Sequence, residues 1–384
     1  MSQYEVTIVD GVSTLPAEDW NRLVGSASPF LEAGFLQALE DTGRLTVETG
    51  WVPRIFLVRE KGRLVGAAPL YLKDHSAGEF VFDWAWADAS HRAGIPYYPK
   101  AVVAVPFTPV TGTRLLTLPD HHQAPQIRRL LVEAILAFAD QEKLSSVHFN
   151  FIPASDQALF EELGLPLRIG LQYHWKNRHF ECFDDFLARF RSKQRANIRR
   201  ERRELRQEGI GTRILRGDQI TEEDMARIFH FYRDTVQKFF YGRQYLNEAF
   251  FLRLRETLPS RLHLVFIEQA GQAHPFGGTF NLHKGDRLYG RYWGASQDVR
   301  FAHFETCIYA PVEWAIQNGV QVFEPGAGGD HKYDRGFEPT PTYSAHYLRH
   351  PALRRGVEEY LHQERIHMQA QLQALRNASP LKDI

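Results

Sequence analysis

The alternation of strand-like and helix-like segments in the second half of the chain constrains the fold more than any other feature. A strand-like run is followed by two helical stretches, three strand-like runs separated by turn residues, a further helix and two final strands. In chain order these segments are 211–217, 222–239, 247–258, 261–269, 274–283, 286–294, 303–318, 320–325 and 342–350. This order predicts a mixed α/β (α+β) domain in which helices connect the strands.

The first half of the chain follows the same plan more loosely. Its segments are a strand at 4–10, a helix at 29–41, a hairpin turning at Lys61-Gly62, a helix at 124–142 and a strand at 146–151. The order resembles the fold of Gcn5-related N-acetyltransferases (GNAT), so we expect two GNAT-like halves. The expected divisions are 1–180 for the N-terminal half, 181–210 for a basic linking helix, 211–350 for the C-terminal acyltransferase half and 351–384 for a C-terminal helix.

The charge and cysteine content exclude several classes of protein. The chain carries 46 basic and 46 acidic residues, so it is not a polycation that binds nucleic acid over its whole surface. The two cysteines are too few for a disulfide framework or a four-cysteine zinc site, and the 17 histidines lack an HExxH motif. The sequence shows neither a signal peptide nor an apolar run of about 20 residues. We therefore expect a cytoplasmic protein without a metal site.

The loop at 323–339, FEPGAGGDHKYDRGFEP, is the most informative segment for chemistry. It follows a short apolar strand, at the edge where open α/β sheets place their binding sites. Its glycines allow the backbone to approach a ligand closely, and its cations can hold phosphate or carboxylate groups. The alternative is a polar turn with solvated charges. The candidate residues of this loop are Glu324, Asp330, His331, Lys332 and Arg335.

Two segments that precede this loop add further candidates. In the strand LYGRYWG, alternation predicts that Tyr289, Arg291 and Trp293 share one face. Arg291 then either forms an internal ion pair or clamps an anionic substrate. In the next helix, His303 and Cys307 are four residues apart and share a face. A Cys–His nucleophile pair is one interpretation, and a small core cysteine is the favoured one because no third orienting group is evident.

The first half contributes segments that are dense in aromatic residues and resemble the wall of a cleft. A packed core would account for the aromatic residues equally well. These segments are 78–89, 97–100 and 106–114, and the candidate residues in them are Asp83, Tyr98, Lys100 and Trp84.

A strongly basic stretch, Arg189–Gly209, joins the two halves. It carries nine basic and three acidic residues at helical spacing. This helix either binds phosphate or RNA, with tRNA as the candidate partner, or is a solvated bridge between the halves.

Together these segments resemble the FemAB-like predicted N-acyltransferases, a family of peptidoglycan biosynthesis and recognition proteins. The pieces that carry the resemblance are GEFVFDWAWADA, YYPK, PFTPVTG, RANIRRERR, LYGRYWG, HFE and EPGAGGDHKYDRGFEP. The wider Fem family has two GNAT-like halves joined by a basic helical stretch, and it transfers an aminoacyl group from aminoacyl-tRNA to an amine of a peptidoglycan precursor. Its loop after the last core strand ends in a Lys/Arg-Gly-Phe element, which corresponds here to Lys332 through Arg335-Gly336-Phe337.

The sequence departs from GNAT enzymes that use coenzyme A. Those enzymes carry Q/R-x-x-G-x-G/A between the fourth strand and the following helix, where backbone N–H groups hold the pyrophosphate. The nearest string here, Arg291-Tyr-Trp-Gly294-Ala-Ser296, is off by one residue and starts inside a strand. This departure weighs against coenzyme A. Two donors, aminoacyl-tRNA and acyl-CoA, stay under consideration, and we expect no tightly bound cofactor.

We predict an N-acyltransferase in which a neutral amine attacks an activated ester or thioester. An amine like that of lysine has a pKa of ~10.4, so a base must take its proton near pH 7. The expected proton acceptors are Glu324 and His331, with Asp330 behind them. Lys332, Arg335 and Arg291 would hold anionic groups and the developing oxyanion.

The remaining candidates would bind substrate. They are Tyr289 and His303 near the loop, and Asp83, Lys100, Tyr98 and Trp84 on the acceptor side. The competing hypotheses are a CoA-dependent GNAT N-acetyltransferase and a non-catalytic module that binds RNA or a cell-wall precursor.

Overall fold

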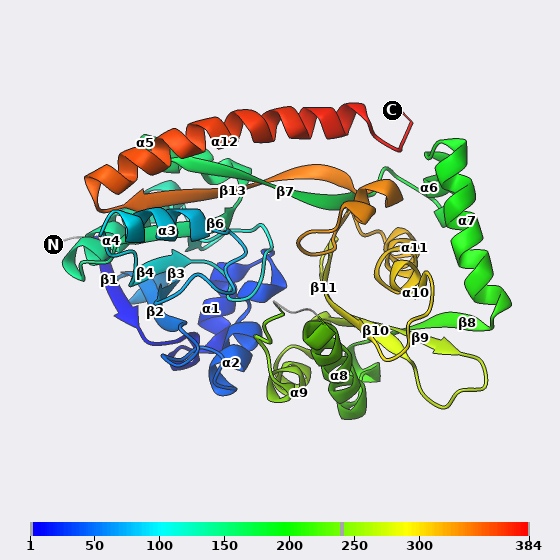
Figure 1. The fold of residues 1–384 in the computed structure, drawn as a ribbon. Helices are drawn as coiled ribbons and strands as arrows, with labels where there is room; N and C mark the ends of the chain where they lie inside the picture. Colours follow the sequence, from blue (N-terminus) through cyan, green and yellow to red (C-terminus); the bar gives the residue numbers. More distant parts are fainter. Residues whose placement is uncertain (1–2, 239–241, 383–384) are drawn as a thin grey trace. The chain divides into compact units, whose positions relative to one another are not determined.

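The computed structural model describes residues 3–238 and 242–382, which form two compact units (Figure 1). The first unit consists of Met1–Leu171 and Pro341–Gln371, and the second of Gln172–Thr340 and Leu372–Ile384. The sequence-based divisions at 180, 210 and 350 differ from these boundaries. The difference arises because the chain leaves the first unit inside strand β7 (Leu167–Lys176) and returns to it inside strand β13 (Glu338–Leu348).

The first unit contains a mixed sheet in the order β1-β2-β3-β4-β6-β13. Neighbouring strands are antiparallel except β4 and β6, which are parallel and are connected through the long helix α4. The strands are β1 (Tyr4–Val9), β2 (Val52–Glu60), β3 (Arg63–Lys73), β4 (Lys100–Val103), β6 (Ser146–Ile152) and the short β5 (Leu116–Thr117), which pairs with β3. The helices are α1 (Ala17–Val24), α2 (Ala33–Asp41), α3 (Trp84–Arg92), α4 (Ala124–Gln141), α5 (Gln157–Glu162) and the greater part of α12 (Pro351–Asn377), up to residue 371.

The core of the first unit forms where α4 packs on this sheet. Ile127, Leu131 and Ile135 of α4 are fully buried in one cluster with strand residues such as Phe56 and Phe149. Spacings of four residues place these side chains on one stripe of the helix. Burying each of them contributes about 1.5–3 kcal/mol, so apolar packing holds this unit together.

The second unit repeats the plan with the strand order β8-β9-β10-β11-β12-β7. Its strands are antiparallel except β11 and β12, which are parallel and are connected through α10 and α11. The strands are β8 (Ile210–Arg216), β9 (Leu262–Gln269), β10 (Gly277–Lys284), β11 (Arg287–Ala295) and β12 (Val322–Glu324). The helices are α6 (Phe183–Ala188), α7 (Ser192–Gln207), α8 (Glu222–Lys238), α9 (Glu248–Thr257), α10 (Ala302–Phe304) and α11 (Ala310–Gln317), the last two linked by a π-helical turn at Glu305–Tyr309. This repetition confirms the predicted tandem GNAT-like fold. The last residue of the predicted helix 222–239 lies outside the described residues.

Each sheet is completed by a strand from the other half of the sequence. In the second unit, Trp175 and Lys176 of β7 pair with Phe323 and Val322 of β12. In the first unit, residues 343–348 of β13 pair with β6. A division by sequence order alone separates these two strands from the sheets that they complete.

Helices cover both faces of the second sheet. Along β10, Phe280 packs against Phe251 of α9, whereas Asn281 contacts His263 of β9, whose ring packs on Trp314 of α11. On the first of these faces α8 lies so close to β11 that only glycine fits at 294, because an added Cβ would lie 1.8 Å from the carbonyl oxygen of Phe231. A cavity whose lining includes Asn281 opens on the other face.

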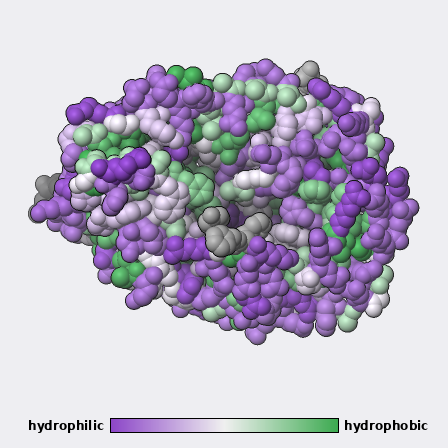
Figure 2. Space-filling view, viewed as in Figure 1, coloured by the Kyte–Doolittle hydropathy of each residue, from purple (hydrophilic) through white to green (hydrophobic). Residues whose placement is uncertain are grey.

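The face shown in Figure 2 is mostly hydrophilic, with apolar side chains scattered over it. Among the described residues, the large hydrophobic side chains that are exposed are Ile8, Val47, Phe82, Trp84, Tyr360 and Ile366. Within residues 3–238 and 242–382, no helix combines the length and the apolar character that a membrane crossing needs.

Candidate functional site

A cavity of about 240 Å³ lies in the second unit, where the parallel strands β11 and β12 separate. The two strands pair only from Arg287 opposite Val322 to Tyr289 opposite Glu324. β11 continues to Ala295, whereas β12 ends and the chain turns away at Pro325. Residues 290–293 of β11 line one wall, and the glycine-rich segment after β12 lines another. The cavity therefore follows directly from the short length of β12.

A β-bulge at Arg291 determines which side chains of β11 face the cavity. Phe280 pairs with Tyr292 and Asn281 with Gly290, so Arg291 is an extra residue on β11. The bulge reverses the alternation, and Trp293 shares the cavity face with Gly290 while Tyr289 faces the other side. The prediction that Tyr289 and Trp293 share a face was wrong for this reason. Arg291 itself lines the cavity, and Tyr289 does not.

Lys332 lines the cavity and holds the glycine-rich loop in place. It belongs to a 3-10 helix, Asp330–Arg335, and its Nζ donates to the carbonyl oxygens of Gly326 at 2.9 Å and of Pro325 and Ala327 at 3.3 Å. Burial lowers the pKa of Lys332 to about 8; the Cys307 thiol opposes this change and the Arg291 guanidinium adds to it. Lys332 is thus a buried cation close to its titration point.

His303 and His331 place two imidazole rings in the cavity wall, with centroids 5.1 Å apart. Burial, together with the nearby His331, Lys332 and Arg335, lowers the pKa of His303 to about 4. Burial and the same two cations also lower the pKa of His331. Both rings are therefore neutral near pH 7 and can accept a proton.

Arg335 and Asp330 lie beside the cavity rather than in its lining. The Arg335 guanidinium donates to Glu201 of α7 at 3.1 Å and to the hydroxyl of Tyr309 at 2.9 Å, and it stacks on the ring of Phe304. These contacts fix the 3-10 helix that carries Lys332. Asp330 is exposed and accepts a hydrogen bond from Tyr173 at 3.3 Å.

Glu324, the last residue of β12, is buried and forms an ion pair with Arg287, whose Nη1 lies 2.7 Å from Oε1. The other carboxylate oxygen is 3.8 Å from Nε2 of His174. Glu324 is not among the lining residues of the cavity.

Cys307 lines the cavity, and burial raises the pKa of its thiol far above the usual range. The thiolate, which is the nucleophilic form, is therefore disfavoured at neutral pH.

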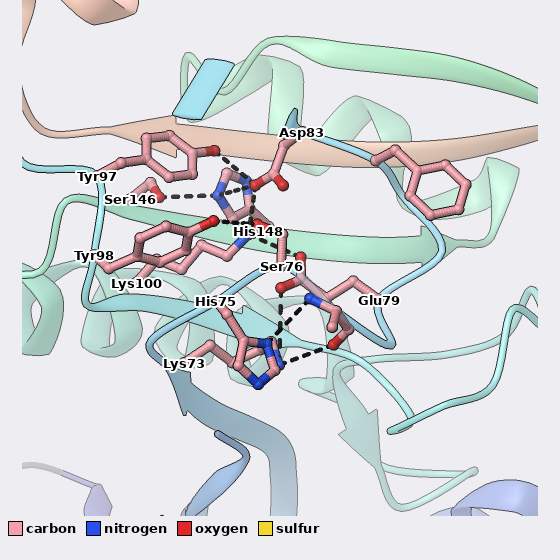
Figure 3. A network of polar contacts seen from close by, with 12 residues as sticks. Lys73, His75, Ser76, Glu79, Asp83, Tyr97, Tyr98, Lys100, Ser146 and His148 are labelled. Carbon is pink, nitrogen blue, oxygen red and sulfur yellow. Dashed lines mark hydrogen bonds and ion pairs between the residues drawn. The ribbon is translucent and has the colours of Figure 1, made fainter. Parts of the chain in front are cut away.

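Three of the four candidates from the first half lie in a buried polar network of the first unit (Figure 3). Lys100 Nζ donates to Glu79 Oε2 at 2.9 Å and to Ser76 Oγ at 2.8 Å, and it contacts Asp83. The hydroxyl of Tyr98 lies 2.8 Å from Ser76 Oγ. The fourth candidate, Trp84, is 49% exposed at the start of α3.

The charges of this network are compensated inside the first unit. Burial raises the pKa of Glu79 to about 7, and the Lys100 ammonium limits the rise. Burial also acts to raise the pKa of Asp83, but Lys100 and His148 outweigh it and keep that pKa below its usual range. The structure thus gathers the first-half candidates in one unit and the second-half candidates in the other.

The basic helix α7 has a structural side and an exposed side. Arg202 forms ion pairs with Glu305 at 2.9 Å and with Glu313 at 2.6 Å. In contrast, the exposed basic side chains of α7 are Lys193, Arg199, Arg200, Arg203 and Arg206, of which Arg199 pairs with Asp184 and Arg200 with Glu204.

Sequence reasoning missed two polar residues of the cavity, Thr279 and Asn281 of β10. They alternate with Gly278, Phe280 and Leu282 in the buried part of the strand, which ends in His283 and Lys284. The sequence did contain a signal for them. Two uncharged polar residues stand at a spacing of two in a strand that must be buried on both faces, and buried polar groups need a partner.

Comparisons with known proteins agree with this fold. A sequence model of the FemAB-like family, described as peptidoglycan biosynthesis/recognition, matches residues 11–383. The crystal structure of FemX superposes with a TM-score of 0.56 at 11% identity, covering 92% of this chain and 100% of that one. The structure of L-PGS from Bacillus licheniformis superposes with a TM-score of 0.53 at 13% identity, covering 89% of this chain and 94% of that one. The C-terminal domain of a putative lysylphosphatidylglycerol synthetase from Agrobacterium fabrum superposes with a TM-score of 0.55 at 10% identity, covering 90% of this chain and 96% of that one. A search of curated proteins found no matching sequence.

Proposed function

Because the chain belongs to the FemAB-like family, we propose that it is an N-acyltransferase that moves an acyl or aminoacyl group from an activated carrier to an amine. The observation that carries this proposal is the composition of the cavity in the second unit. Its lining combines the cations Lys332 and Arg291 with the neutral imidazoles of His303 and His331, and no carboxylate is among the described residues that line it. Such a lining suits a reaction in which negative charge develops on the substrate while a proton is removed.

In the proposed reaction, the amine nitrogen attacks the carbonyl carbon of the activated ester or thioester. The carbonyl oxygen becomes an oxyanion next to the Lys332 ammonium and Arg291. The amine proton passes to the imidazole of His331 or His303. The bond from carbon to the carrier oxygen or sulfur then breaks, and the imidazolium returns the proton to the leaving group. The products are an amide and the free carrier.

We propose aminoacyl-tRNA as the donor. A pyrophosphate site of the coenzyme A type needs a loop that exposes backbone N–H groups before the helix after β11. Here residues 296–301 contain no glycine and include the acidic Asp298, and the N-cap position of α10 holds the bulky Phe301 at a φ of 66°. The exposed cations of α7, by contrast, suit the phosphate backbone of RNA. The acceptor amine that the family resemblance implies is that of a peptidoglycan precursor.

A transfer assay tests this proposal. Purified protein is incubated with Nα-acetyl-L-lysine N-methylamide as the amine and with either total tRNA charged with radiolabelled amino acids or radiolabelled acetyl-CoA. We expect label to reach the amine from charged tRNA and not from acetyl-CoA. Transfer from acetyl-CoA would identify a CoA-dependent acetyltransferase. RNA binding with a steep salt dependence but no transfer from either donor would instead support a non-catalytic module.

A further inference from the structure

We propose that Asn281 binds the attacking amine through its side-chain oxygen, and that His263 fixes the orientation of the Asn281 amide. This inference rests on the proposed amine acyl transfer and assigns the nucleophile a place in the cavity.

Asn281 lines the cavity, and its side-chain oxygen lies beside Gly290, another lining residue. It lies on β10 in the cavity lining, and its partner on β11 is Gly290. A Cβ at position 290 would lie 3.4 Å from Asn281 Oδ1 and 3.2 Å from both Phe323 Cε2 and Pro325 Cα, so a side chain there would fill the space next to that oxygen, which the glycine leaves free. The nearby hydroxyl of Thr279 is 3.4 Å from the same oxygen, but it donates its proton to the carbonyl oxygen of Tyr292 at 2.9 Å. Asn281 Oδ1 therefore keeps capacity to accept a hydrogen bond from a ligand.

The direction of the Asn281 amide follows from its contacts with β9. Asn281 Nδ2 lies 3.1 Å from the backbone carbonyl oxygen of His263 and 3.3 Å from its ring Nδ1. A carbonyl oxygen can only accept, so the nitrogen of the amide must face β9 and the oxygen must face the other way. The second proton of Nδ2 can then be accepted by Nδ1 of His263, provided that Nδ1 carries no proton.

The protonation state of His263 suits this role. Its ring is fully buried, and burial, with help from Arg216 and His283, lowers its pKa to about 3, so the ring is neutral. With Nδ1 as the acceptor, the ring proton resides on Nε2, which is buried and has no hydrogen-bond partner among the described residues. A buried donor without a partner costs free energy. In this tautomer the contact of Nδ1 with Asn281 Nδ2 is the hydrogen bond that the ring makes in return.

An amide oxygen also suits the chemistry of the nucleophile. A carboxylate at this position would bind the amine as an ammonium ion and would suppress its nucleophilicity. An amide oxygen accepts a hydrogen bond from an N–H group of the neutral amine and leaves the nitrogen lone pair available for attack. The cations Lys332 and Arg291 in the same lining further disfavour a bound ammonium ion. Asn281 and its cationic surroundings therefore select the reactive form of the nucleophile.

Binding of the amine alone tests the inference, because it needs no acyl donor. The ¹⁵N-labelled protein is titrated with Nα-acetyl-L-lysine N-methylamide, a lysine derivative whose free amine is that of the side chain. Binding is followed by NMR through the side-chain amide resonances of Asn281. For the wild type we expect the apparent affinity to rise about tenfold per pH unit between pH 7 and 9, because only the neutral amine binds and its pKa is ~10.4. In Asn281→Asp, followed by backbone resonances, we expect this pH dependence to vanish.

A matched pair of variants tests the role of His263. His263→Asn places an amide oxygen near the position of Nδ1 and should bind the amine within about threefold of the wild type. His263→Phe keeps a ring against Trp314 but removes the acceptor, and should weaken binding about tenfold, the equivalent of one hydrogen bond. Should His263→Phe fail to fold, Asn281→Ala provides the same test of the oxygen, again with about a tenfold weaker affinity.

The outcomes of these titrations separate amine binding at Asn281 from acyl transfer. Equal amine affinity in the wild type, His263→Phe and Asn281→Ala, or an affinity that does not change with pH, would overturn the inference. Amine binding with the expected pH dependence, but no transfer from any donor, would refute the acyltransferase proposal and leave Asn281 as an amine-binding residue.

Discussion

At the residue scale, the chemistry of the cavity depends on how burial changes the protonation of its side chains. Burial lowers the pKa of Lys332 to about 8 and that of His303 to about 4, and it also lowers the pKa of His331. Near pH 7 the described lining therefore combines a lysine cation with two imidazole bases. These are the protonation states that attack by an amine on an ester requires.

The pKa of Lys332 leads to a prediction about pH. If the ammonium stabilises the oxyanion, kcat at saturating amine should decline above about pH 8, because Lys332 loses its proton there rather than near its usual pKa. In Lys332→Arg the cation persists, so the decline should move to higher pH by at least about one unit in whatever activity remains. A pH profile of transfer measures this. A decline at the same pH in both proteins would show that another group titrates.

A second prediction concerns which residue takes the amine proton. His331 lines the cavity, whereas Glu324 lies outside that lining in an ion pair with Arg287. The geometry therefore favours His331, although the sequence pattern was compatible with both. We expect His331→Asn to lower kcat by about 10²–10⁴ and Glu324→Gln to lower it less than about tenfold in folded protein. The reverse ranking, measured by single-turnover transfer, would assign the base to Glu324.

At the element scale, the cavity exists because β12 is only three residues long, and the bulge in β11 determines which side chains face it. The alternation of apolar and polar residues predicted the strands of the second unit. A bulge, however, changes which face of the sheet a side chain lies on and leaves no mark in that alternation. For this reason Tyr289 was expected beside Trp293 and lies on the opposite face. The polar residues Thr279 and Asn281 were missed because a strand pattern alone does not show which of its faces borders a cavity.

The close approach of α8 to β11 gives a third prediction. In Gly294→Ala the added Cβ would lie 1.8 Å from the carbonyl oxygen of Phe231, so the helix and the strand must move apart. We expect the free energy of unfolding to fall by about 3 kcal/mol. The control is Gly211→Ala on β8, where an added Cβ meets no described atom within 4 Å and the expected change is less than about 0.5 kcal/mol. Urea denaturation of both variants measures the difference, and similar stabilities would contradict the packing argument.

At the scale of the whole molecule, the chain consists of two GNAT-like units, each of which contains a strand from the other half of the sequence. The order of segments was enough to predict the tandem fold, because hydrophobic periodicity is a local property. The places of β7 and β13 in the two sheets were not predictable, since strand pairing between distant segments leaves no local pattern. The same limit applies to Asp83 and Lys100, whose shared buried network depends on tertiary contacts.

The two sides of α7 lead to a fourth prediction, about RNA. We consider the charge reversal of three exposed cations, Lys193→Glu, Arg203→Glu and Arg206→Glu. It should weaken tRNA binding and make the binding depend less on salt. The slope of log affinity against log salt concentration should decrease by roughly 0.7–0.9 for each phosphate that is no longer neutralised. Arg202 is unsuitable for this test because its ion pairs with Glu305 and Glu313 support the fold. Filter retention measured over a range of salt concentrations checks this, and an unchanged slope would return α7 to the role of a solvated bridge.

The most direct test of the central claim is single-turnover transfer by Lys332→Ala, compared with the wild type and with Lys143→Ala, a control at an exposed lysine of the first unit. Labelled aminoacyl-tRNA is the donor and Nα-acetyl-L-lysine N-methylamide the acceptor. If the cavity between β11 and β12 carries out the reaction, the rate of Lys332→Ala should fall by about 10²–10⁴ with its fold intact, and Lys143→Ala should match the wild type. Full activity of folded Lys332→Ala would show that the chemistry takes place elsewhere in the molecule.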